Sequence, residues 1–160
     1  MVTPPPPDRS LSAVLVRAFL FCSAGYVVVY ALGYTFAGLW RGGGASPGGT
    51  LLGNAAIAAY VFLVTAIPAA FGFAVVTSPW SAFRDLSPRA VAGISAAGGV
   101  AAGLAQLTGL AGLLSWVPLP GFLGPIGAAL RMLLPGLAVG IVALAALGAA
   151  RLLRPASPAP

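Results

Sequence analysis

The sequence contains no histidine, lysine or glutamate, and its only acidic residues are Asp8 and Asp85. Acid–base catalysis by paired carboxylates and nucleophilic catalysis by a Ser-His-Asp triad therefore lack the side chains they need. The same absences leave no set of zinc ligands, and no histidine for haem or for the magnesium of a chlorophyll-type pigment. We expect a protein that is not an enzyme and that holds neither a metal nor a cofactor.

Charge is scarce as well, at 6% of the chain, against about 25% in an ordinary soluble domain. Hydrophobic residues make up 59% of the chain and the mean hydropathy is +1.01, which indicates a membrane protein with several crossings. The net charge of +6 comes from arginines that stand singly at segment ends, so nucleic acid is not an expected partner. Cys22 is the only cysteine, so no intrachain disulfide can form.

One stretch, residues 90–116, carries no charge and is very rich in glycine and alanine. It is long enough to cross a bilayer core of about 30 Å, which takes about 20 apolar residues in a helix. Gly99 and Gly103 form a G-x-x-x-G step there, and Gly136 and Gly140 repeat this spacing further on. Small residues at this spacing let membrane helices approach closely, so we expect these faces to pack against other helices.

Four apolar segments are predicted to cross the membrane: 11–40, 50–77, 90–116 and 125–153. The proline-rich start, 1–10, and the end, 155–160, are expected to be disordered tails around a single domain over 11–154. Short connections make successive segments antiparallel neighbours. The predicted fold is an all-α, integral-membrane four-helix bundle with up-down-up-down topology.

The arginines outside these segments divide unequally between the two sides of the membrane. One side holds Arg9, Arg84, Arg89, Arg151 and Arg154, and the other holds Arg41. Because basic residues favour the cytoplasmic side, both termini are predicted to be cytoplasmic. Arginine as the only basic residue, with abundant alanine, glycine and proline, is typical of a GC-rich bacterial genome, which suggests a bacterial inner membrane.

Three polar side chains are candidates for a site in the outer half of the membrane. Asn54 lies near the outer end of the second segment, Gln106 lies on the glycine face of the third, and Arg131 lies at a similar depth in the fourth. Together they could hold an anion or an anionic lipid headgroup, although mutual hydrogen bonding is the interpretation we favour. Arg17, in the first segment, is expected to extend its guanidinium to the nearer interface.

Tyrosines form a second candidate site. Tyr26 and Tyr30 share one face of the first segment, and a hydroxyl in mid-bilayer needs a hydrogen-bond partner, so this face should turn toward other helices. A pigment or quinone could stack there, but an aromatic stripe at helical spacing more often serves packing. In the second segment, Pro68 is expected to kink the helix near its cytoplasmic half.

The main functional hypothesis is a non-catalytic membrane subunit that packs, through its small-residue faces, with other membrane proteins or with copies of itself. The lipid bilayer is its other expected partner. A small channel or transporter for an anion or amphiphile, built on Asn54, Gln106 and Arg131, is one alternative. A membrane scaffold that binds lipid or pigment at Tyr26 and Tyr30 is another.

Overall fold

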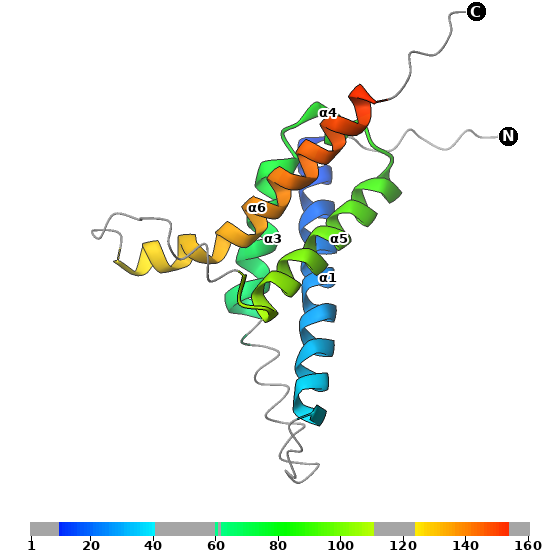
Figure 1. Cartoon of the computed structure of the whole chain (residues 1–160). Helices are drawn as coiled ribbons and strands as arrows, with labels where there is room; N and C mark the ends of the chain where they lie inside the picture. Colours follow the sequence, from blue (N-terminus) through cyan, green and yellow to red (C-terminus); the bar gives the residue numbers. More distant parts are fainter. Residues whose placement is uncertain (1–9, 41–59, 61, 111–123, 154–160) are drawn as a thin grey trace, which may run out of the picture.

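The structure, a computed structural model, describes residues 10–40, 60, 62–110 and 124–153 and contains only helices over them (Figure 1). In chain order the elements are α1 (Leu11–Trp40), η1 (Phe62–Ala66), α3 (Ile67–Thr77), α4 (Ser81–Arg84), α5 (Pro88–Leu107) and α6 (Gly124–Leu152). Among the described residues there is no strand. The expected all-helical fold is confirmed for this part of the chain.

Three helices are long and apolar enough to cross a membrane. The candidate spans are Leu11–Tyr30 in α1, Pro88–Leu107 in α5 and Arg131–Leu152 in α6. A shorter apolar stretch, Leu63–Thr77, belongs to η1 and α3. These lengths and compositions agree with the membrane protein expected from the sequence.

The first helix occupies the range expected for the first segment, and a local hydrogen bond explains where it begins. The backbone N–H of Ala13 donates to the Ser10 hydroxyl at 3.3 Å, so Ser10 satisfies a donor that the first helical turn leaves open. Most of the two predicted tails lies outside the described residues. So do residues 50–59 of the second segment, including Asn54.

The second segment changes helix type immediately before Pro68. The turn over Phe62–Ala66 is π-helical, and the α-helix begins at Ile67 with Pro68 in its first turn. Proline lacks a backbone N–H, and in a regular helix its ring would meet the carbonyl of residue 64. A wider turn just ahead of it accommodates the ring, so the helix changes type beside the proline at which a kink is predicted.

The third helix differs from its prediction at both ends. It begins at Pro88, where the Ser87 hydroxyl accepts the N–H of Ala90 at 3.2 Å. It ends at Leu107, because Gly109 takes a positive φ of 78°; residues 111–116 of the predicted segment lie outside the described residues. Such a conformation ends helices, and glycine adopts it without steric cost. The apolar run thus continues beyond the helix.

The connection between α3 and α5 contains a short helix, α4, over Ser81–Arg84. Its Phe83 is fully buried and meets Phe73 of α3 edge to face, with ring centroids 6.4 Å apart and planes at 77°. Around this aromatic pair lies the main core cluster, which also includes Val14, Ala18, Cys22, Ala70, Ala74 and Val91. Phe83 therefore anchors the connection between α3 and α5 to the hydrophobic core.

The last helix changes direction near its middle. Figure 1 shows the early, yellow part of α6 leading away from the other helices, whereas its later part lies along α3 and ends near α4. Pro135 lies inside the helix. Since Pro135 cannot donate to the carbonyl of residue 131 and its ring crowds that carbonyl, a bend at this point has a direct cause.

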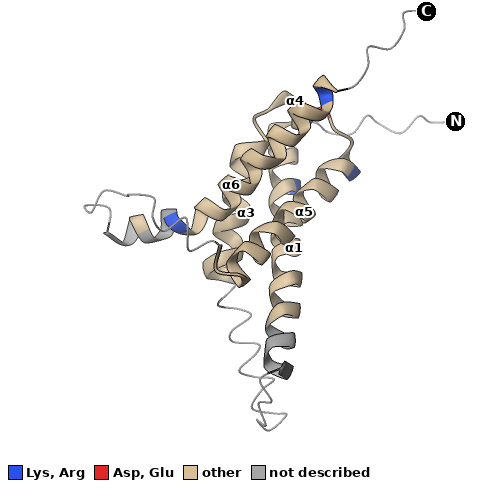
Figure 2. Cartoon of the chain, viewed as in Figure 1, with Lys and Arg blue, Asp and Glu red and all other residues tan. Residues whose placement is uncertain are grey.

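Most of the described basic residues lie at one end of the molecule, where α1 begins and α6 ends (Figure 2). Arg151 in the last turn of α6 donates to the carbonyl oxygen of Ala82 at 2.9 Å and lies 4.0 Å from the Asp85 carboxylate. Both side chains of this ion pair are about half exposed, so it is weak. It nevertheless joins α6 to α4.

Candidate functional site

Two helix crossings dominate the interior, and the first joins α1 to α5. The backbones approach so closely that a Cβ atom at Gly99 would overlap the carbonyl oxygen of Cys22 and lie 2.8 Å from the nitrogen of Tyr26. Gly25, on the α1 side, faces the carbonyl of Ala96 in the same way. Gly103 lies one turn further along, against Val29. Only glycine permits this backbone-to-backbone contact.

The second crossing joins α3 to α6 by the same means. A Cβ at Gly136 would overlap the carbonyl oxygen of Ala69, and one at Gly72 would lie 2.6 Å from the carbonyl oxygen of Leu133. Gly140 continues the contact against Val76. Both G-x-x-x-G pairs are therefore covered by other helices of this chain. They are not free surfaces for a partner protein, contrary to what the main hypothesis assumed of them.

Tyr26 stands beside the first crossing and is almost completely buried. Its ring stacks on that of Tyr30, with centroids 6.2 Å apart and planes within 6°. Its hydroxyl is hydrogen-bonded to Thr65 in the π-helical turn, and Ala66, Ala69 and Ala102 complete its surroundings. A planar ligand would have to displace this packing, so the structure adds no support to a pigment site, which stays a prediction.

Tyr26→Phe is expected to lower the free energy of unfolding by about 1 kcal/mol, because it removes the hydroxyl that Thr65 contacts. Thermal unfolding in detergent, followed by circular dichroism, measures the change. Tyr60→Phe is the matched control, since that side chain is 63% exposed. Equal effects of the two substitutions would show that the buried hydroxyl contributes nothing specific.

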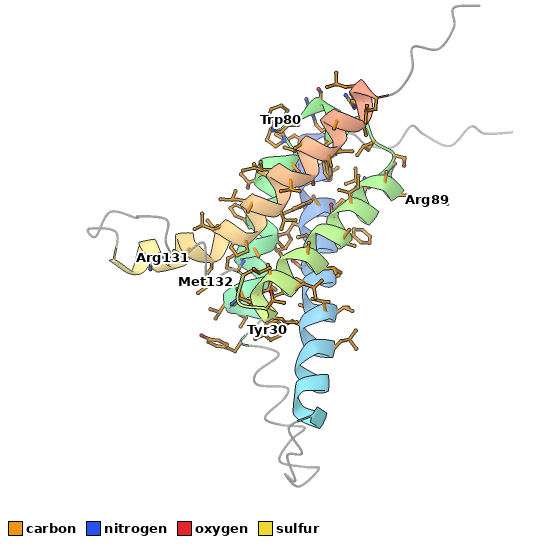
Figure 3. All side chains as sticks on the ribbon, viewed as in Figure 1. Tyr30, Trp80, Arg89, Arg131 and Met132 are labelled. Atoms are coloured by element: carbon orange, nitrogen blue, oxygen red, sulfur yellow. The ribbon has the colours of Figure 1, made fainter. Side chains whose placement is uncertain are left out.

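The polar residues expected to form an outer site are not brought together by the described structure. Gln106 is half-buried near the end of α5, whereas Arg131 is exposed on the part of α6 that leads away from the other helices (Figure 3). Neither side chain has a hydrogen bond or ion pair with another described residue. Asn54 lies outside the described residues. An anion channel built on these three residues stays a prediction.

Sequence reasoning missed a surface on the opposite side of α5. Gly93, Ala97 and Ala101 are all exposed and lie on one face at intervals of four residues. A Cβ at Gly93 would have nothing within 4 Å. The four-residue spacing of these small residues is visible in the sequence, but only Gly99 and Gly103 match the better-known G-x-x-x-G motif. We call Gly93, Ala97 and Ala101 the outer face of α5.

Among the described residues no group of three or more His, Cys, Asp or Glu side chains is close enough to hold a metal ion. The fold and its two crossings define an all-helical protein with membrane-length apolar helices, held together by glycine contacts between backbones. No protein-family model, characterised protein or solved structure matches this chain. Its function therefore has to be argued from its own surfaces.

Proposed function

We propose that the chain is a non-catalytic subunit of the bacterial inner membrane that packs with other membrane proteins or with copies of itself. In this proposal it crosses the bilayer four times as an up-down-up-down bundle, with both termini in the cytoplasm. The second crossing in this proposal is residues 50–77, of which the shorter apolar stretch Leu63–Thr77 lies in the described part of the chain. Arg151 contacts Ala82 and Asp85, beside Arg84, so basic residues of α4 and of the end of α6 lie on one side, which supports this orientation.

The outer face of α5 is the observation that carries the proposal. Each glycine at the two crossings lies against another helix of this chain, which leaves no room for a Cβ atom. A Cβ atom at Gly93 would meet nothing within 4 Å. A surface that met only lipid would need no glycine, which is the poorest helix former apart from proline. In membranes, small residues repeated every four positions are typical of close contact between helices. A partner helix would fit against this face.

The outer side of α6 supports the same conclusion. In the span Arg131–Leu152 only Pro135, Gly136 and Gly140 are buried. Ala145, Ala149 and Gly148 are exposed on its second half, and a Cβ at Gly148 would have nothing within 4 Å. This helix thus leaves most of its length open to lipid or to another subunit.

The proposal is tested on protein extracted from its native membrane in mild detergent. We expect the chain to be recovered in particles larger than the 15.8 kDa monomer, and Ala97→Leu to reduce that fraction by about fivefold or more, because the added side chain holds a partner helix away. Light scattering coupled to size-exclusion chromatography measures the mass.

Ala24→Leu is the matched control, because it makes the same change at an exposed position on α1. It should leave the assembly intact. Recovery of the unmodified chain as a uniform monomer with no companion protein would contradict the proposal. Equal losses with Ala97→Leu and Ala24→Leu would remove the outer face of α5 as the contact surface.

A further inference from the structure

A shallow hollow of about 520 Å³ lies on the outer side of α1, near its start. It is lined by Ser12, Ala13, Val16, Arg17, Leu20 and Phe21. These residues lie on the side of α1 away from Val14, Ala18 and Cys22, which are buried in the core. The hollow therefore faces the surroundings of the protein and not its interior.

The upper part of this hollow is basic and polar. Arg17 is half-buried and has no ion pair or hydrogen bond with any other described residue. Side chains on a helix tilt toward its N-terminus, so Arg17 leans toward Ala13, one turn earlier, whose small side chain leaves room beside the guanidinium. The Ser12 hydroxyl lies 3.1 Å from that of Ser10 and retains further hydrogen-bonding capacity.

The lower part of the hollow is apolar. Val16, Leu20 and Phe21 are 53%, 56% and 44% exposed, and they continue the same side of the helix for a further turn. Arg17 lies about 9 Å along the helix axis from Leu11, since each residue advances about 1.5 Å. A guanidinium that extends toward the start of α1 therefore reaches the level of lipid headgroups, while the apolar residues remain among acyl chains.

The protein offers no acidic side chain to balance this charge within its described part. Asp85 is the one acidic residue there, and it is 4.0 Å from Arg151. Arg89, at the start of α5 (Figure 3), is also basic but is not among the residues that line the hollow. An anion that balances Arg17 would therefore come from outside the described chain.

We propose that this hollow binds one anionic phospholipid, with its phosphate at Arg17 and Ser12 and an acyl chain along Val16, Leu20 and Phe21. Charge complementarity favours an anion, because arginine presents several donors to phosphate oxygens. The exposed apolar side chains of Val16, Leu20 and Phe21 beside Arg17 favour a lipid over a soluble anion. This inference rests on the proposed membrane location but not on the proposed role as a subunit.

The test uses the full chain reconstituted in vesicles of phosphatidylcholine and phosphatidylglycerol, then extracted in mild detergent. Native mass spectrometry counts the phosphatidylglycerol molecules that remain bound. We expect one to be retained preferentially, and Arg17→Gln to reduce its retention by about fivefold, the loss expected for one arginine near a lipid phosphate. Ser12→Leu, which fills the hollow at an exposed position, should reduce it without changing the charge.

Arg89→Gln is the matched control, because it removes the same charge at the same end of the molecule. Equal reductions by Arg17→Gln and Arg89→Gln would mean general attraction of anionic lipid and would overturn the site. Retention unchanged in both Arg17→Gln and Ser12→Leu would overturn it as well. Flotation of every variant with the vesicles checks membrane insertion separately, so failure of the location and failure of the site are distinguishable.

A second copy of the chain could cover the hollow instead of a lipid. Val16→Cys in the vesicles decides this, because Cys22 is buried and leaves residue 16 as the accessible thiol. Near-complete disulfide cross-linking of two chains through residue 16 would overturn the lipid proposal. Absence of cross-linking, together with the lipid retained by the unmodified chain, would support it.

Discussion

Gly99→Ala is expected to destabilise the protein by about 3 kcal/mol, the upper end of the usual cost of overpacking a close contact. The added methyl group would overlap the carbonyl oxygen of Cys22 and crowd the nitrogen of Tyr26. Both are backbone atoms and cannot rotate away, so α1 and α5 would have to separate. The midpoint of thermal unfolding in detergent, followed by circular dichroism, measures the loss.

Gly148→Ala is the matched control for this substitution. It makes the same chemical change in another apolar helix, at a position where a Cβ has nothing within 4 Å. Its effect should stay within about 1 kcal/mol, the difference in helix propensity between the two residues. If the two variants unfolded at the same temperature, close contact at the α1–α5 crossing would not be what stabilises the fold.

Phe83→Ala is expected to cost about 3 to 5 kcal/mol, the range found when a buried aromatic ring is removed. Phe83 is fully buried and loses its edge-to-face contact with Phe73 in this variant. Since α4 is only Ser81–Arg84, no other buried side chain of that helix holds it to the core. Chemical denaturation in detergent measures the loss, and limited proteolysis should find new cleavage between α3 and α5.

The comparison for Phe83→Ala is Trp80→Ala, which removes a larger ring that is 58% exposed. Trp80 stands at the end of the molecule, close to α4 (Figure 3). Its loss should destabilise the protein by less than half as much. A larger effect for Trp80→Ala would mean that the interfacial ring, and not the buried one, anchors this connection.

The apolar helices were predictable because their signal is local. A helix that crosses a bilayer must satisfy its backbone within itself, so composition and length alone indicate where it lies. Leu11–Trp40 is found over the range expected for the first segment. The end of α5 was not predicted, because hydropathy continues through Gly109 while the backbone turns there. The burial of Phe83 is not readable from its polar neighbours Arg84 and Asp85, because it depends on the contact with Phe73 in another helix.

The candidate site shows the same division between local and tertiary information. The sequence indicated which residues could permit close packing, and Gly99, Gly103, Gly136 and Gly140 all lie at helix contacts. It could not say which helix each would meet, because partner choice depends on the arrangement of the whole bundle. Arg131 and Gln106 were expected to lie together because they come at similar depths in their segments. That expectation assumes straight helices, whereas α6 bends near Pro135.

The pairing of the helices has a consequence for how the chain is made. The most extensive contacts join α1 to α5 and α3 to α6. In each pair, another apolar segment lies between the two helices in the sequence. A ribosome therefore delivers α1 to the membrane well before the helix that covers Gly25 has been translated. Neither tight pair exists in a chain that stops after α3, and the second forms only once α6 has emerged. Contacts between α1 and α3 can form earlier, whereas both close crossings are completed late in synthesis.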